Sequence, residues 1–395
     1  MFEETKRSGA TPPAQLPRGQ RILITGGTGF IGTALTDRLC AENEVVIFDR
    51  KLEGSSWALS GHNCHRNVKI LLGDVLDADQ VARAVEDVDS VIHLAAIVGV
   101  NAVRSRPRAT IETNFLGTLT LLRAVERLPV LPRVVYFSTS EVFGINSFRV
   151  QECMSTSIGP VQETRWSYSI SKLVGEHLLQ CYHRELGLPT VTIRPFNVFG
   201  PGRIGDHALL RFIVNALRHE DLIVHGAGDQ IRSWCYIDDF VDGVLAALVR
   251  PEAVGEDFNL GNPRNTLTVY ELAKRVLSIT GSTSKIRLVQ TNYADVDIRV
   301  PHMEKARQLL GFDPAVDIDE GIRRTVAWCW DHVEELAAIL ATAPAPVATH
   351  DGNGNGNGNG NGRAAHAGAG SAVSITAAPA LSLVHQDLLR RAGGR

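Results

Sequence analysis

Two side chains in the segment RWSYSISK could take part in proton transfer. Tyr168 and Lys172 are four residues apart, a spacing that places both on one face of a helix. A lysine ammonium beside a phenol favours the phenolate, so we expect Lys172 to lower the pKa of Tyr168 from its ordinary value of about 10. Such a tyrosine can take the proton of an alcohol while a hydride leaves the same carbon atom. On its own, however, this spacing is common and usually marks a solvated helix face.

A second group of polar residues follows the apolar run PRVVYF. The segment FSTSEVFG (137–144) contains three hydroxyls and an acid, namely Ser138, Thr139, Ser140 and Glu141. A simple turn would need Gly, Asn or Pro instead. Thr139 or Ser138 could hydrogen-bond a hydroxyl that is being oxidised, with Ser140 and Glu141 further along the substrate. In the alternative interpretation, Glu141 only caps a turn or pairs with a nearby cation.

The third pattern is the glycine-rich segment RILITGGTGFIG. Its glycines are spaced so that a tight turn can join a strand to a helix whose N-terminus offers free N–H groups to phosphates. Asp49 ends the next apolar run and is placed to accept hydrogen bonds from ribose hydroxyls, which favours NAD over NADP, although Arg50 could soften that preference. Asp74 and Val75 follow the third run and are expected near the adenine. The residues that we assign to the cofactor site are Gly26, Gly29, Phe30, Ile31, Gly32, Asp49, Asp74, Val75, Leu94, Ala95, Tyr168 and Lys172.

Short apolar runs that alternate with helical patterns must position these residues. The predicted strands lie at 21–26, 44–50, 68–74, 90–96, 133–139 and 190–196. Continuous apolar strands separated by helices indicate an α/β fold with a doubly wound parallel sheet of the Rossmann type. After about residue 200 the alternation becomes irregular, which predicts a smaller C-terminal lobe that binds substrate over the carboxyl ends of the strands.

Composition limits the remaining possibilities. The chain has 395 residues, 44% hydrophobic and 21% charged, with a net charge of -3, so we expect no nucleic acid or membrane partner. No metal-ligand spacing occurs among the cysteines and histidines, and no signal peptide or membrane span is apparent, which predicts a cytoplasmic protein without a metal site. The expected organisation is a flexible leader (1–20), an NAD-binding domain (21–200), a region that is mainly the substrate lobe (201–340) and a disordered Gly/Asn/Ala-rich tail (345–395).

The motifs TGGTGFIG, HLAA, STSEVFG, YSISK and RPFNVFGPG occur in this order, and in this respect the chain resembles the extended short-chain dehydrogenase/reductase family of nucleotide-sugar enzymes over residues 20–335. The resemblance implies an enzyme with tightly held NAD, a nucleotide diphosphate-sugar substrate and a homodimer formed by the helices near 114–127 and 168–186. It implies catalytic roles for Thr139, Tyr168 and Lys172. It also implies that Asn197 and Arg232 contact the nucleotide diphosphate and that Arg203 binds the substrate.

Within this family, GPVQETRWSYSISK and NYADVDIRVPHMEKARQLLGF resemble two groups, the UDP-glucuronic acid decarboxylases of aminoarabinose synthesis and the UDP-apiose/UDP-xylose synthases. The resemblance implies that Tyr293 and Arg299 bind substrate, that Arg299 faces the hexuronate carboxylate, and that Ser140 and Glu141 act in catalysis. Oxidation at C4 of a hexuronate produces a β-keto acid that loses CO2 readily. Sugar 4,6-dehydratases usually carry Asp at the position of Ser140, although some dehydratases share Thr-Ser-Glu. A 4-epimerase or a 4,6-dehydratase is therefore the alternative to a decarboxylase, and a non-catalytic NAD-binding protein is the third hypothesis.

Overall fold

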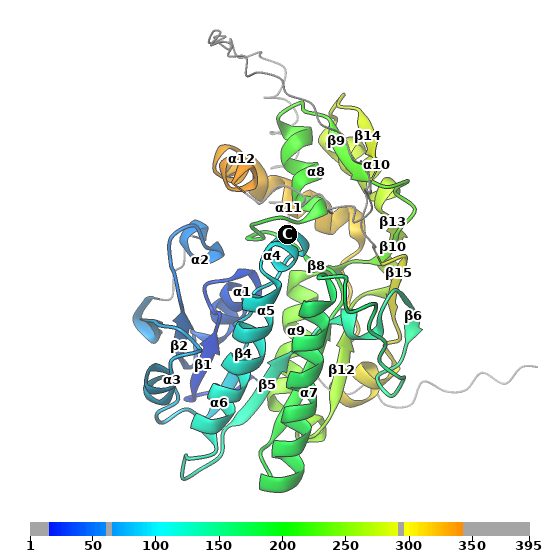
Figure 1. Cartoon of the computed structure of the whole chain (residues 1–395). Helices are drawn as coiled ribbons and strands as arrows, with labels where there is room; N and C mark the ends of the chain where they lie inside the picture. The colour runs from blue at the N-terminus through cyan, green and yellow to red at the C-terminus, as the bar shows by residue number, and fades with distance from the viewer. Residues whose placement is uncertain (1–15, 61–64, 291–295, 343–395) are drawn as a thin grey trace, which may run out of the picture.

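The computed structural model describes residues 16–60, 65–290 and 296–342 (Figure 1). Most of the predicted leader, the whole predicted tail and Tyr293 lie outside these ranges. Within them, no helix is both long and apolar enough to span a membrane. Nor do three or more His, Cys, Asp or Glu side chains of these ranges gather as metal ligands would.

A seven-stranded parallel sheet forms the centre of the larger part of the molecule. Its order is β12-β7-β5-β4-β1-β2-β3, in which β1, β2 and β3 run outward to one edge and the connection from β3 to β4 returns the chain to the middle of the sheet. The strands are β1 (Arg21–Thr25), β2 (Glu44–Asp49), β3 (Val68–Leu72), β4 (Ser90–His93), β5 (Arg133–Phe137), β7 (Thr190–Pro195) and β12 (Asp257–Leu260). This sheet confirms the predicted Rossmann-type fold, and its first six strands in sequence are those that the apolar runs predicted.

Helices cover both faces of this sheet (Figure 1). Successive residues of β1 alternate between the faces, so that Ile22 and Ile24 pack with one hydrophobic cluster and Leu23 with the other. The helices of this part are α1 (Phe30–Leu39), α2 (Ser56–Leu59), α3 (Ala78–Ala84), α4 (Val100–Ser105), α5 (Pro107–Ile111), α6 (Gly117–Val125), α7 (Trp166–Leu186) and α9 (Ile237–Val249). Helices α1 and α9 lie side by side on the first face, and α3, α6 and α7 lie on the second.

The smaller part occupies the upper region of Figure 1. A mixed sheet of order β13-β10-β15-β6 forms its base, and β11-β8 and β14-β9 are two further, separate strand pairs. Its strands are β6 (Asn146–Val150), β8 (Val198–Phe199), β9 (Leu222–His225), β10 (Ile231–Ser233), β11 (Cys235–Tyr236), β13 (Thr266–Thr268), β14 (Ile286–Val289) and β15 (Ile298–Pro301). Its helices are α8 (Ala208–Leu217), α10 (Val269–Thr280), α11 (Ile318–Asp331) and α12 (Val333–Ala341).

Single-turn and π-helical segments join these elements. They are η1 (His65–Asn67), η2 (Glu112–Leu116), η3 (Ser140–Phe143), η4 (Pro251–Ala253), η5 (Pro263–Asn265) and η6 (Ala306–Leu310). Among them η3 places the hydroxyl-rich segment directly after β5, and η2 joins α5 to α6.

The chain crosses between the two parts more than once. Strand β6 leaves the larger part to join the sheet of the smaller one, whereas α9 and β12 return from the smaller part to the large sheet. The sequence predicted neither crossing. These crossings matter for the site, because they bring β5, α7, β10 and β15 together at one place.

Candidate active site

The glycine-rich turn is shaped by close backbone contacts. Gly26 has a positive φ of 71°, and a Cβ atom there would lie 2.7 Å from the backbone nitrogen of Ala95. A Cβ atom on Gly32 would lie 2.6 Å from Cα of Gly27. Helix α1 begins at Phe30 after Gly29, and no side chain caps its N-terminus. The turn therefore has a shape that only glycine permits and leaves helical N–H groups available to a pyrophosphate.

Two carboxylates lie at the ends of the neighbouring strands β2 and β3. Asp49 accepts hydrogen bonds from the Thr28 amide (3.1 Å) and the Thr28 hydroxyl (2.6 Å), which ties it to the glycine turn. Arg50 points to Asp74, with 3.9 Å between Nη1 and Oδ2. Val75 packs against Gly117, where an added Cβ atom would lie 2.6 Å from Val75 Cγ2. Together with the glycine turn, these residues fit a dinucleotide whose adenosine lies over the ends of β2 and β3.

Tyr168 and Lys172 lie on α7 as their spacing predicts, but the expected effect of Lys172 on the pKa of Tyr168 is wrong. Burial, and after it the carboxylate of Glu141, raises the pKa of Tyr168 above its ordinary value. Burial also lowers the pKa of Lys172 to about 7, against the opposing influence of Glu176. The Lys172 ammonium lies over the ring of Tyr136, 5.0 Å from its centroid. Only the charged ammonium favours the phenolate, and a pKa of about 7 leaves Lys172 partly uncharged near neutral pH.

Thr139 is the hydroxyl that lies beside Tyr168. A hydrogen bond between the two side chains lowers the pKa of Tyr168, as do the charges of Arg299 and Arg203. Thr139 also accepts a hydrogen bond from the Glu141 amide at 3.2 Å and thereby caps η3. Ser138, Thr139 and Ser140 are all buried, and of these hydroxyls it is Thr139 that hydrogen-bonds Tyr168. Of the two hydroxyls that the sequence offered for contact with a reacting alcohol, the structure favours Thr139.

Glu141 lies between two buried arginines. Its Oε1 atom is 3.4 Å from Nη2 of Arg299 and 3.8 Å from Nη2 of Arg165. The Ser169 hydroxyl donates to Oε2 of Glu141 at 3.4 Å. We did not predict Arg165 from the sequence, although it lies three residues before Tyr168, a spacing that places both on one side of a helical turn. The result is a compact group of two guanidinium groups and one carboxylate beside the reactive tyrosine.

Further cations come from the smaller part. Arg232 on β10 and Arg299 on β15 are register partners, so both occupy the same position across neighbouring strands. Arg203 lies over the ring of Phe30, 5.3 Å from its centroid, and burial lowers its pKa to about 10. Asn197, in the left-handed region with φ of 39°, donates to the Ser233 carbonyl at 2.8 Å. The structure thus brings the predicted substrate residues to the carboxyl ends of β5 and β7, Tyr293 excepted.

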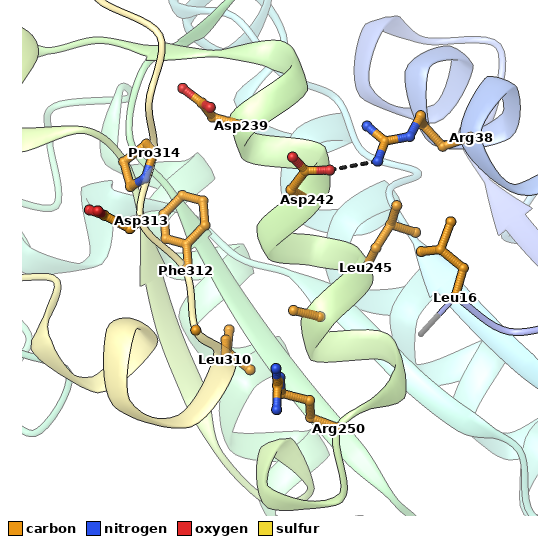
Figure 2. Close-up of a pocket in the computed structure, with 12 residues that line it drawn as sticks. Leu16, Arg38, Asp239, Asp242, Leu245, Arg250, Leu310, Phe312, Asp313 and Pro314 are labelled. Atoms are coloured by element: carbon orange, nitrogen blue, oxygen red, sulfur yellow. Dashed lines mark hydrogen bonds and ion pairs between the residues drawn. The ribbon is translucent and has the colours of Figure 1, made fainter. Parts of the chain in front are cut away.

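A pocket of about 330 Å³ lies elsewhere, beside α1 and α9 (Figure 2). Its polar lining includes Arg38, which pairs with Asp242 at 2.7 Å, and Asp239, whose carboxylate accepts from the Ala315 and Val316 amides. None of the predicted catalytic, cofactor or substrate residues lines this pocket.

Comparisons with known proteins agree with this fold and this site. The model of the NAD dependent epimerase/dehydratase family matches residues 22–261, and the chain belongs to this family, whose cofactor is NAD. It is 34% identical over 322 residues to UDP-N-acetyl-alpha-D-glucosaminuronate decarboxylase of Bacillus cytotoxicus, an alignment that covers 78% of this chain and 97% of that protein. It is 35% identical over 307 residues to UDP-glucuronic acid decarboxylase 5 of Arabidopsis thaliana, covering 76% and 87%.

Solved structures are similar as well. The UDP-glucuronic acid 4-epimerase of Bacillus cereus, in complex with UDP-glucuronic acid and NAD, superposes with a TM-score of 0.71 at 28% identity. That superposition covers 80% of this chain and 99% of the epimerase. The chain is accordingly an NAD-dependent enzyme of the extended short-chain dehydrogenase/reductase type.

Proposed function

We propose that this enzyme decarboxylates a UDP-hexuronate, with UDP-glucuronate as the first substrate to test. The observation that carries the proposal is the position of Arg299 and Arg165 around Glu141, next to Tyr168 and Thr139. Buried guanidinium groups bind carboxylates in a bidentate manner and with little screening. The named decarboxylase relatives support the same assignment.

In this proposal the residues of the chain divide the reaction between them. Bound NAD supplies the acceptor for the hydride of the sugar C4. Thr139 hydrogen-bonds the C4 hydroxyl and Tyr168 takes its proton. Arg299, Arg203 and the Thr139 hydrogen bond favour the phenolate form of Tyr168, whereas burial and Glu141 oppose it.

The 4-ketone that results is a β-keto acid. The C5–C6 bond breaks, CO2 leaves, and the electron pair moves through C5 to the oxygen at C4, after which C5 takes a proton. Arg299 holds the carboxylate before it leaves, and we assign to Glu141 and Ser140 the control of the proton at C5. The pentose ketone is then either released or reduced again at C4.

Mass spectrometry of the products tests the proposal. The enzyme, saturated with NAD, is incubated with UDP-glucuronate, UDP-N-acetylglucosaminuronate, UDP-glucose and UDP-galactose. We expect a loss of CO2 from at least one uronate and from neither neutral sugar. The 4-epimerase similarity makes UDP-galacturonate the competing product. Because UDP-galacturonate and UDP-glucuronate have the same mass, they are first separated by chromatography. Formation of UDP-galacturonate without loss of CO2 would identify an epimerase and reject the decarboxylase assignment.

A homodimer is part of this proposal. Apolar side chains remain exposed along η2 and α7, including Leu116 (42% exposed) and Val174 (39% exposed), and η2 packs beside α7. Such a face on neighbouring helices suits pairing with a second copy. Light scattering at micromolar concentration should give twice the chain mass, and Val174→Glu should reduce it. A wild-type monomer would contradict the dimer.

The cytoplasmic location remains a prediction from the sequence, which fractionation of the source cells would check.

A further inference from the structure

A second tyrosine, Tyr136, lies directly beneath the reactive lysine. It is fully buried on β5, and Lys172 on α7 is 2% exposed. The ammonium of Lys172 lies 5.0 Å from the centroid of the Tyr136 ring. The Tyr136 hydroxyl donates a hydrogen bond of 3.1 Å to the backbone carbonyl of Lys172 itself. One side chain therefore contacts both the charged end of Lys172 and the helical turn from which it projects.

The approach of Tyr136 to α7 depends on Gly175. A Cβ atom on this residue would lie 2.1 Å from the Tyr136 hydroxyl and 2.6 Å from Cζ, which is closer than real atoms can come. Gly175 lies three residues after Lys172, so it opens the helix surface next to the lysine. A glycine inside a helix costs about 1 kcal/mol relative to alanine. Here the glycine allows a contact that a Cβ atom at this position would block.

The Tyr136 ring is also supported by His93. The two residues are register partners on β4 and β5, and their rings stack with centroids 5.9 Å apart. His93 Nδ1 hydrogen-bonds Thr25 Oγ1 at 2.6 Å, and His93 Nε2 hydrogen-bonds Thr118 Oγ1 at 3.0 Å. Because Thr118 donates its own proton to the Asn114 carbonyl, Nε2 is the donor in that bond. Burial lowers the pKa of His93 to about 3, so the ring is neutral near pH 7. The stack holds the Tyr136 ring in place without adding a second positive charge beside Lys172.

We propose that Tyr136 is a positioning residue for Lys172, with its ring face holding the ammonium through a cation–π contact and its hydroxyl fixing the turn that carries it. This inference rests on the proposed function and on the catalytic role that the family resemblance implies for Lys172. Tyr136 itself touches neither substrate nor cofactor in this assignment. It acts through Lys172, whose ammonium then reaches the reactive end of α7 in a fixed orientation.

The contact also bears on the charge of Lys172. Burial lowers the pKa of Lys172 to about 7, and Glu176 on the same helix opposes that effect. The other titratable groups around the ammonium are His93, held neutral, and the phenols of Tyr136 and Tyr168, whose pKa values burial raises. A cation–π contact favours the ammonium form, so its removal should lower the pKa of Lys172 further. A buried contact of this kind corresponds to a shift of about one pH unit.

A titration of Lys172 tests the proposal without any sugar substrate. The protein is labelled with ¹³Cε-lysine and saturated with NAD, and the Lys172 resonance is assigned by its loss in Lys172→Met. Three proteins are compared: wild type, Tyr136→Phe, which keeps the ring face, and Tyr136→Met, which fills much of the volume without one. We expect the midpoint of Tyr136→Met to fall by about one pH unit and that of Tyr136→Phe by less than about 0.3.

An unchanged midpoint in Tyr136→Met, or an equal fall in Tyr136→Phe, would overturn the role of the ring face. Should Tyr136→Met fail to fold, ring-fluorinated phenylalanines at position 136 weaken the π face at almost constant shape. The midpoint should then fall stepwise with the number of fluorines, and no change across that series would likewise reject the proposal. On a substrate that the wild type converts, the alkaline limb of kcat should move to lower pH by the same amount. Failure to release CO2 would count only against the proposed function.

Discussion

Replacing Arg299 by methionine should weaken the binding of UDP-glucuronate while leaving that of UDP-glucose nearly unchanged. The two sugars differ at C6, where only the uronate carries a carboxylate for a guanidinium to hold. Methionine keeps the apolar stem of the side chain and removes its charged fork. Because Arg165 stays 3.8 Å from Glu141, the variant does not leave that carboxylate without a cation. The fold should therefore survive the change.

The size of the effect follows from the burial of Arg299. Its side chain is only 9% exposed, so a bond to a substrate carboxylate keeps the strength of a charge-assisted hydrogen bond instead of that of a screened surface pair. Such a bond contributes about 1.5–3 kcal/mol. At 1.4 kcal/mol for each factor of ten, the Kd of UDP-glucuronate should rise by about 10- to 150-fold.

Calorimetry with both nucleotide sugars on the NAD-loaded enzyme measures this directly. Arg232→Met is the matched control, since Arg232 is the register partner of Arg299 and the family resemblance assigns it to the diphosphate. Arg232→Met should weaken the binding of both nucleotide sugars by similar factors. If Arg299→Met also weakens the binding of both nucleotide sugars equally, Arg299 binds the diphosphate or supports the fold, and its assignment to the carboxylate is refuted.

Three further predictions concern the residues around this arginine. Tyr168→Phe should lower kcat by at least about 100-fold and leave NAD bound, as fluorescence titration of the cofactor can check; activity within threefold of wild type would reject its role. Glu141→Gln should reduce CO2 release by about 100-fold while C4 oxidation, followed as NADH absorbance, continues; parallel loss of both would place Glu141 at the first step. The pKa of His93 falls from 6.5 to about 3 on folding, chiefly through burial. The contribution of His93 to the free energy of unfolding should therefore be largest above pH 6.5 and should fall toward pH 3 by up to about 1.4 kcal/mol per pH unit. Chemical denaturation at several pH values measures this slope, which should be shallower in His93→Asn.

Most of the large sheet could be predicted because its strands are visible in the local sequence as apolar runs. Six of them are apolar runs, such as ILI in β1 and VVI in β2, followed by glycine or a polar residue. The seventh, β12, has only the residues DFNL and no long apolar run, so nothing local distinguishes it from the loops around it. Its membership depends on pairing with β7, which is a tertiary contact. The same reason explains why β6 could not be assigned to the smaller part.

The composition of the site was predictable, but its electrostatics were not. Helical spacing correctly places Tyr168 and Lys172 together on α7, and the end of β5 brings Thr139 to Tyr168. The sign of the Tyr168 pKa shift depends on burial and on Glu141, which lies in another segment. Tyr136 reads as an ordinary core residue of an apolar strand, and only the three-dimensional structure shows Lys172 over its ring. The spacing of residues in the sequence therefore identifies the reactive side chains, whereas their burial in the folded protein determines their pKa values.

The charges around Tyr168 also explain how this site could accept a substrate that is itself an acid. A hexuronate brings a second carboxylate close to Glu141, and two carboxylates in a buried place raise each other's pKa unless cations separate them. Arg165 flanks Glu141 from the position just before α7, and Arg299 flanks it from β15, an element remote in sequence. With Arg165 beside Glu141, Arg299 can turn its fork to the carboxylate of the substrate. An ionised substrate carboxylate is the form that leaves as CO2, so the second arginine has a chemical purpose that a neutral sugar would not require.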